Sequence, residues 1–183
     1  MKTTRILLTA LVIIGCTFGS FAQRKKTVVV IDRVPRSKIE YRKAIPKSTV
    51  VRTIPSKAKV IQHNKLNYYF REGRYYRHIN GKYILAKPPV GLAIATLPAA
   101  FVKLRVGTAV LFYSEGVFYQ SVSSKYKVVD PPMNAIVPEL PDGAEKVSID
   151  RQTYFEYYGV LYKQVRTENG RAYKVVGKVD DDR

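Results

Sequence analysis

Three tyrosines at one fixed interval are the side chains best placed to form a binding site. Tyr76, Tyr119 and Tyr162 follow one another at intervals of 43 residues. A row of aromatic rings can stack on sugars or on nucleic-acid bases. Tyrosines can instead pack their rings in a core and hydrogen-bond through their hydroxyls, and this structural interpretation is the one we favour.

Catalytic chemistry has little support in the sequence. Cys16 is the only cysteine, and the two histidines, His63 and His78, have no counterparts 43 residues further on. No Gly-rich phosphate loop, HExxH motif or paired-cysteine spacing occurs. The acidic run at 180–182 lacks the alternating ligand spacing of a calcium loop and is typical of a solvated tail. We therefore expect a protein that is not an enzyme, with no catalytic residues, no cofactor and no metal site.

Positive charge is the strongest remaining signal. The chain has 32 Lys and Arg against 14 Asp and Glu, and residues 23–90 alone carry a net charge of +15. A one-sided field of this kind attracts anionic polymers, and we expect weak binding to an anionic surface or glycan. The residues predicted to carry it are Arg24, Lys25, Lys26, Arg42, Lys43, Arg71, Arg74 and Arg77. Nucleic acid is an unlikely partner, because no recognised nucleic-acid-binding fold accompanies the charge.

A 43-residue period organises the chain that carries these residues. Gly73, Gly116 and Gly159 mark it, and the predicted units cover residues 48–90, 91–133 and 134–183. Short runs of β-branched and aromatic residues between turn-forming glycines predict four to five strands in each unit. The expected fold is all-β, with three tandem units of short antiparallel strands that form small SH3-like barrels or stacked sheets.

Alternation along the strands predicts which side chains are buried. Adjacent residues on a strand point to opposite faces, so Tyr75, Phe118 and Leu161, one residue before each tyrosine, are expected in the core. The tyrosines themselves share a face with a more polar set, namely Arg74, His78, Ser121 and Gln164. Residues 110–113 are apolar on both faces, which predicts cover on each side of that strand.

The N-terminus predicts export. Residues 1–22 have the charged start, apolar run and small residues of a signal peptide, with cleavage expected before Gln23. Lipidation at Cys16 is the alternative and would anchor the protein to a membrane. Residues 23–47 are predicted to form a basic, largely flexible arm. The expected location is the periplasm, the outer membrane or the extracellular space.

The pattern Tyr-Tyr-x-x-Gly-x-Tyr-Tyr, followed by Tyr-x-Val-Val-x-Pro-Pro and Leu-Pro, resembles a family of secreted bacterial envelope proteins that is known only as a domain of unknown function. The resemblance covers residues 48 to about 178, and it implies export and a repeated small β unit. The expected function is a non-catalytic envelope protein, structural or adhesive, whose partner is an anionic envelope polymer or an envelope protein. The alternative is an envelope enzyme, or a regulatory subunit of a cell-wall or polysaccharide hydrolase. The sequence leaves the oligomeric state open.

Overall fold

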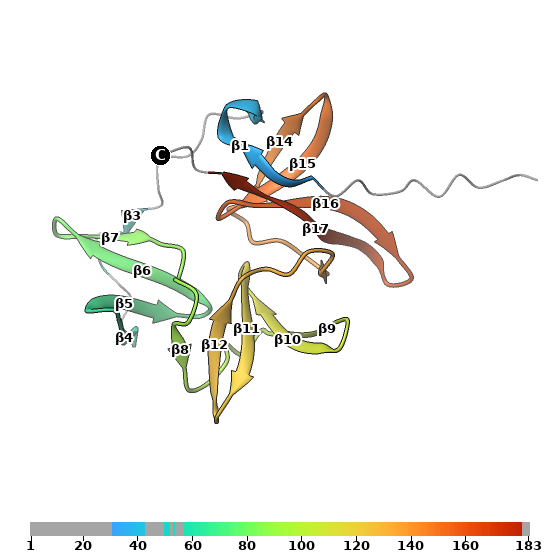
Figure 1. The fold of residues 1–183 in the computed structure, drawn as a ribbon. Coiled ribbons are helices and arrows are strands. Elements are labelled where there is room, and N and C mark those ends of the chain that lie inside the picture. Colours follow the sequence, from blue (N-terminus) through green and yellow to red (C-terminus); the bar gives the residue numbers. More distant parts are fainter. Residues whose placement is uncertain (1–30, 43–49, 52, 54–56, 181–183) are drawn as a thin grey trace, which may run out of the picture.

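The computed structural model describes residues 31–42, 50–51, 53 and 57–180, and its fold is all-β. Three small sheets lie around a common centre (Figure 1). Helical structure in the described residues is limited to one 3-10 turn, η1 (Arg36–Lys38). The predicted fold class, all-β with small sheets of short antiparallel strands, is confirmed. The predicted signal peptide, with Cys16 and Gln23, lies outside the described residues.

The first sheet, green in Figure 1, has five antiparallel strands in the order β3-β7-β6-β5-β4. Four of the strands form a meander, and the short β3 pairs with the last of them. The strands are β3 (Val50–Val51), β4 (Lys59–His63), β5 (Leu66–Arg71), β6 (Arg74–Ile79) and β7 (Lys82–Leu85).

The second sheet has the same connectivity, in the order β8-β12-β11-β10-β9. Again the short first strand pairs with the last strand of a four-stranded meander. The strands are β8 (Ala93–Ile94), β9 (Val102–Val106), β10 (Ala109–Ser114), β11 (Val117–Val122) and β12 (Lys125–Val129).

The third sheet repeats this connectivity and gains two strands from the N-terminal part of the chain. Its order is β1-β17-β16-β15-β14-β2, and β13 pairs with β17 as well. The strands are β1 (Asp32–Pro35), β2 (Glu40–Tyr41), β13 (Ile136–Val137), β14 (Glu145–Ile149), β15 (Gln152–Tyr157), β16 (Val160–Thr167) and β17 (Gly170–Asp180). β1 runs parallel to β17, whereas the other strand pairs of the three sheets are antiparallel.

Each four-stranded meander has a sharp turn between its second and third strands. The central turn residues are Glu72-Gly73, Glu115-Gly116 and Tyr158-Gly159, and all six have positive φ. Positive φ at both positions is the type I′ geometry that matches the twist of a β-hairpin. These hairpins occur where the sequence predicted glycine turns.

Two apolar cores join consecutive sheets. The core between the first and second sheets contains Tyr68, Phe70, Tyr75, Leu92, Ile94, Val117, Tyr119 and Val128. The core between the second and third contains Leu111, Tyr113, Phe118, Ala135, Val137, Tyr157, Val160, Tyr162 and Val175. Strand β10 contributes Phe112 to the first core and Leu111 to the second, so the predicted cover on both of its faces is observed.

Residues 31–42 differ from the flexible arm that the sequence predicted. β1 pairs with one edge of the third sheet and β2 with the other, and η1 followed by Ile39 connects them. The sheet is thereby curled around a third core, in which Val34 and Ile39 pack against Leu161. The segment is basic, but its few apolar residues complete a barrel-like unit whose other strands lie more than a hundred residues away. The rest of the predicted arm, residues 23–30 and 43–47, lies outside the described residues.

Candidate functional site

The eight basic residues predicted to bind an anionic surface do not form one cluster among the described residues. Arg24, Lys25, Lys26 and Lys43 lie outside the described residues. Arg42 lies beside the third sheet, where its guanidinium donates to Thr153 Oγ1 at 3.1 Å. The other three, Arg71, Arg74 and Arg77, are on β5 and β6 of the first sheet.

Each of these three arginines contacts another side chain. Arg71 forms an ion pair with Glu72 at 3.2 Å, and the Arg77 guanidinium lies 5.2 Å from the centre of the Tyr68 ring. Arg74 donates to Glu115 at 2.9 Å and thus links the first sheet to the second. Arg74 is therefore a partly exposed cation at the junction of the first and second sheets.

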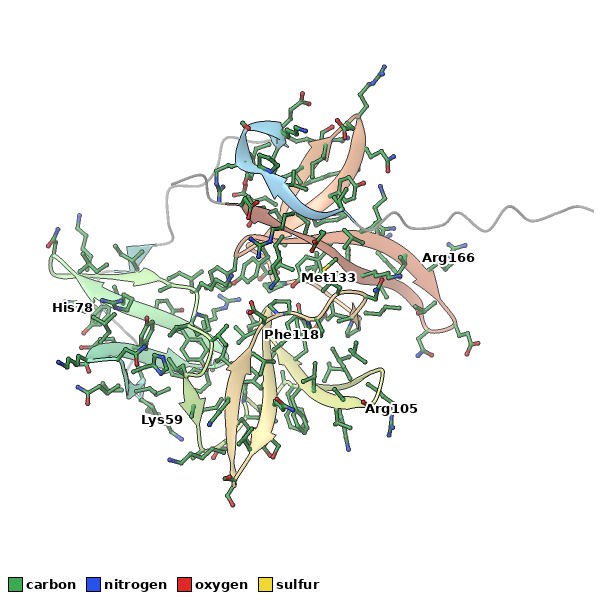
Figure 2. All side chains as sticks on the ribbon, viewed as in Figure 1. Lys59, His78, Arg105, Phe118, Met133 and Arg166 are labelled. Carbon is green, nitrogen blue, oxygen red and sulfur yellow. The ribbon has the colours of Figure 1, made fainter. Side chains whose placement is uncertain are left out.

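Two lysines that the sequence reasoning did not single out form a basic edge on the first sheet. Lys57 precedes β4, which is the edge strand, and Lys59 is the first residue of β4. Both lysines are exposed (Figure 2 labels Lys59). Together with Phe70, Arg71 and Glu72 they line an open hollow of about 180 Å³. The available signal was the spacing of Lys57 and Lys59, two like charges separated by one residue. We call Lys57, Lys59 and Arg71 the basic edge.

The three repeated tyrosines are placed unequally. Tyr119 and Tyr162 are fully buried, each with 0% of its surface exposed, whereas Tyr76 is half-buried. The Tyr119 hydroxyl meets the Tyr75 hydroxyl at 3.0 Å, and burial raises the pKa of both phenols. The preceding sheet packs on the face that carries Tyr119 and Tyr162, so both rings lie in apolar cores.

The three type I′ hairpins meet at the centre of the molecule. A Cβ added at Gly73 would lie 2.9 Å from Glu115 Cγ, and one added at Gly116 would overlap the Tyr157 ring. The hairpin of the first sheet thus touches the hairpin of the second sheet. The hairpin of the second sheet in turn touches β15, next to the hairpin of the third sheet. Gly73 and Gly116 are therefore favoured for two reasons. Both have positive φ, and at both positions a side chain would lie too close to the neighbouring sheet.

A hollow of about 270 Å³ adjoins this meeting point. It is lined by Arg74, Tyr76, Leu85, Glu115, Pro141, Asp142, Gly143 and Tyr157, which come from all three sheets or the loops between them. Arg74 is 2.9 Å from Glu115 and 3.9 Å from Asp142. Burial raises the pKa of Tyr157, so its phenol is a neutral hydrogen-bonding group at physiological pH. These lining residues supply hydrogen-bond donors and acceptors, and no histidine, serine or cysteine is among them.

Most of the chain matches one known protein family. The model of a family of unknown function, DUF6515, matches residues 41–179. The chain belongs to DUF6515. Among curated proteins and solved structures, nothing matches it. The DUF6515 match begins in β2 and ends in β17, so it takes in all three meanders described above.

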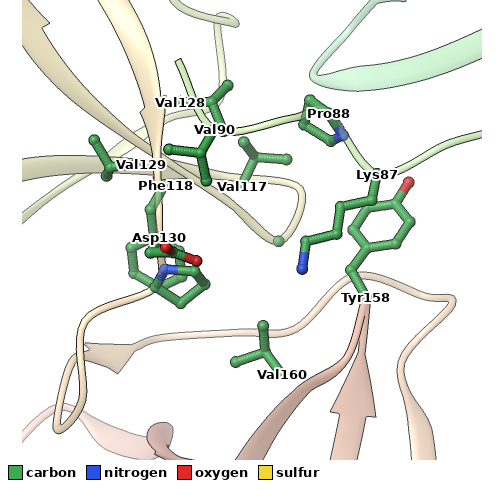
Figure 3. A pocket seen from close by; sticks show the side chains of 12 residues that line it. Lys87, Pro88, Val90, Val117, Phe118, Val128, Val129, Asp130, Tyr158 and Val160 are labelled. Atoms are coloured by element: carbon green, nitrogen blue, oxygen red, sulfur yellow. The ribbon is translucent and has the colours of Figure 1, made fainter. Parts of the chain in front are cut away.

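A third cavity in this DUF6515 chain lies where the first sheet connects to the second, but it is too small for a ligand. Its volume is about 20 Å³, which is room for a single water. Figure 3 shows its lining, to which the connection contributes Lys87 and Pro88, the second sheet Phe118 and the third sheet Tyr158 and Val160. We interpret it as a packing gap at the junction.

In the part of this DUF6515 chain that the structure describes, no group of three or more His, Cys, Asp or Glu side chains has the arrangement to hold a metal ion. Over the same residues, no helix has the length and apolar character needed to cross a membrane.

Proposed function

We propose that this protein is an exported, non-catalytic component of the bacterial cell envelope, structural or adhesive, that binds anionic surfaces or glycans weakly through its basic N-terminal half. Its location would be the periplasm, the outer membrane or the extracellular space. The partner would be an anionic envelope polymer such as lipopolysaccharide or an acidic glycan.

One observation carries the proposal, namely the unequal distribution of charge over the three sheets. Residues 57–90, which include most of the first sheet, contain eight Lys or Arg and one acidic residue, whereas residues 139–180 contain seven of each. A solubilising surface would be served by mixed charges on every sheet. Charge concentrated on one sheet favours attraction of a polyanion to that sheet.

The basic edge offers the clearest contact for such a polymer. Lys57 and Lys59 are exposed at the rim of an open hollow, and the neighbouring Arg71 has a guanidinium that can hydrogen-bond a phosphate or carboxylate. A polymer with repeated charges can lie along an open hollow beside an edge strand without being enclosed by it. Binding of this kind is weak, independent of sequence and sensitive to salt.

The same connectivity in three sheets supports the second part of the proposal, that residues 48–90, 91–133 and 134–183 are tandem 43-residue units. Arrays of units build extended surfaces, and a structural or adhesive role suits such a surface. Catalytic sites rarely occur in triplicate.

The test is binding of purified lipopolysaccharide at increasing salt concentration, measured by isothermal titration calorimetry. The double variant Lys57→Glu/Lys59→Glu should weaken binding at least tenfold at low salt, because each lysine near an anionic surface contributes roughly 1 kcal/mol. The double variant should also make binding less dependent on salt.

The matched control is Lys125→Glu/Lys127→Glu, which makes the same charge change at exposed positions of β12 in the second sheet. This control should bind within about threefold of the wild type, because roughly 1 kcal/mol per lysine applies only near the bound surface. Equal losses in both double variants would show that net charge alone matters. Absence of binding by the wild type at low salt would overturn the proposal.

A further inference from the structure

One face of the first sheet carries a cluster of aromatic rings outside all three apolar cores. We call it the open face and define it by Tyr69, Tyr76, His78 and Tyr83. The ring centres of Tyr69 and Tyr83 are 5.0 Å apart, and those of His78 and Tyr83 are 4.6 Å apart. His78, labelled in Figure 2, is exposed, and Val60 beside Tyr69 is 59% exposed.

The corresponding face of the other two sheets is covered at Tyr119 and Tyr162, whereas Ser121 and Gln164 on the same face are exposed. Phe112 and Tyr126 pack edge to face at 5.3 Å in the second sheet, and Phe155 and Tyr173 at 5.2 Å in the third. These pairs are equivalent to Tyr69 and Tyr83 by strand position. In both sheets the preceding sheet lies over the face and buries the adjoining tyrosine. No sheet precedes the first one in the described chain, so Tyr76 is left half-buried, whereas Tyr69 and Tyr83 are half-buried like their equivalents in the other two sheets.

Residue differences at equivalent positions show what the open face is adapted to contact. Tyr69 corresponds to phenylalanine in both covered sheets, and Asn67 corresponds to Val110 and Thr153. His78 corresponds to Ser121 and Gln164. Compared with both other sheets, the open face therefore adds the phenol hydroxyl of Tyr69 and the imidazole of His78. Both groups can hydrogen-bond a polar ligand at the edge of the aromatic rings.

The open face also leads into the central hollow. Tyr76 and Leu85, opposite each other on β6 and β7, line that hollow together with Arg74. Glu115 and Asp142 line the same hollow and contribute carboxylates beside Arg74. Its volume of about 270 Å³ is close to the lower limit of about 300 Å³ for small-molecule sites.

We propose that the open face and the adjoining hollow bind a chain of pyranose sugars. The apolar C–H faces of successive sugar rings would lie on Tyr69, His78 and Tyr83, and sugar hydroxyls would hydrogen-bond the Arg74, Glu115 and Asp142 side chains in the hollow. Aromatic rings with polar edges suit this ligand, since a sugar ring has an apolar face and a hydroxyl rim. The ligand needs no charge, so this site is independent of the anionic binding proposed above.

The experiment uses the full chain with two uncharged probes, cellohexaose and chitohexaose, in 0.5 M NaCl to suppress binding through the basic edge. Saturation-transfer difference NMR should show transfer to sugar ring protons for at least one probe. Tyr69→Ala should weaken binding about tenfold, the loss expected for one stacked ring. His78→Ser installs the residue of the second sheet at an exposed position, so the fold is retained, and it should weaken binding severalfold.

Two controls separate this site from its alternatives. Ser121→Ala, at the equivalent exposed position of the second sheet, and Lys57→Glu/Lys59→Glu should both leave oligosaccharide binding unchanged. No saturation transfer to either probe at 10 mM, or equal binding by the wild type and both open-face variants, would overturn the inference. A wild-type dimer in analytical ultracentrifugation that becomes monomeric on His78→Ser would also overturn it, because a second copy would then be the occupant.

Discussion

The phenolic oxygens of Tyr75 and Tyr119 lie 3.0 Å apart in the core that joins the first sheet to the second. Either hydroxyl can donate this hydrogen bond. Both side chains are almost fully buried, so each hydroxyl depends on the other for a partner. The bond gives two otherwise apolar sheet faces a fixed relative position.

Tyr119→Phe should lower the free energy of unfolding by about 1–3 kcal/mol, because the buried Tyr75 hydroxyl loses its partner. Urea denaturation measures the change. The double variant Tyr75→Phe/Tyr119→Phe removes both polar groups and should be more stable than Tyr119→Phe alone. Additive losses in the two single variants and the double variant would contradict the coupling.

Tyr162→Phe should have the opposite outcome. Tyr162 occupies the position equivalent to Tyr119, but its buried hydroxyl has no hydrogen-bond partner among the described residues. Removing an unpaired buried hydroxyl should be neutral or should stabilise the fold by about 1 kcal/mol. The same urea experiment tests this, and a loss as large as that of Tyr119→Phe would show that the hydroxyl is satisfied.

Gly116→Ala should be much more destabilising than Gly159→Ala, although both glycines hold the same turn position. Both have positive φ, +79° and +76°, which costs an alanine about 1–2 kcal/mol. At Gly116 the new methyl group would also overlap the Tyr157 ring, whereas at Gly159 no atom lies within 4 Å. Overpacking should add about 1–3 kcal/mol at Gly116. Thermal unfolding of the two variants makes the comparison, and equal losses would exclude a close hairpin contact.

Ile39→Ala should destabilise the protein by about 2–3 kcal/mol, because Ile39 is 7% exposed and packs in the third core. Lys38→Ala, at the exposed neighbouring position, is the control and should change stability by less than about 0.5 kcal/mol. Chemical denaturation of both variants distinguishes the packed segment from a flexible arm. In a flexible arm, neither substitution would matter.

Glu145→Gln should stabilise the protein at neutral and higher pH. Burial, together with the charge of Glu156 directly opposite on β15, raises the pKa of Glu145 above its ordinary value near 4.5. The folded state therefore holds this proton to higher pH than the unfolded state, so the wild type loses stability as pH rises through the folded-state pKa. The advantage of the variant should be present at pH 8 and shrink toward pH 4. Urea midpoints at the two pH values measure it, and a pH-independent difference would contradict the shifted pKa.

The sequence by itself determined the local structure. Glycines at 43-residue intervals, preceded by Glu72, Glu115 or Tyr158, predicted hairpins that the structure places at those positions. Whether a segment forms a strand, and where the chain turns, depends on residues adjacent in the chain. The pattern of β-branched, aromatic and glycine residues is therefore sufficient to predict both. Family membership followed from the same landmarks.

The tertiary structure alone decided which faces are buried and where the charged residues meet. Tyr76, Tyr119 and Tyr162 have the same local pattern, yet only the last two are covered, because cover comes from a preceding sheet. Arg74 and Glu115 are 41 residues apart in sequence and meet only because the hairpins converge. Residues 31–42 pair with strands more than a hundred residues away, and no local signal specifies such a pairing. Burial and ion pairing at these sites are properties of sheet packing, which depends on contacts between segments that are distant in the chain.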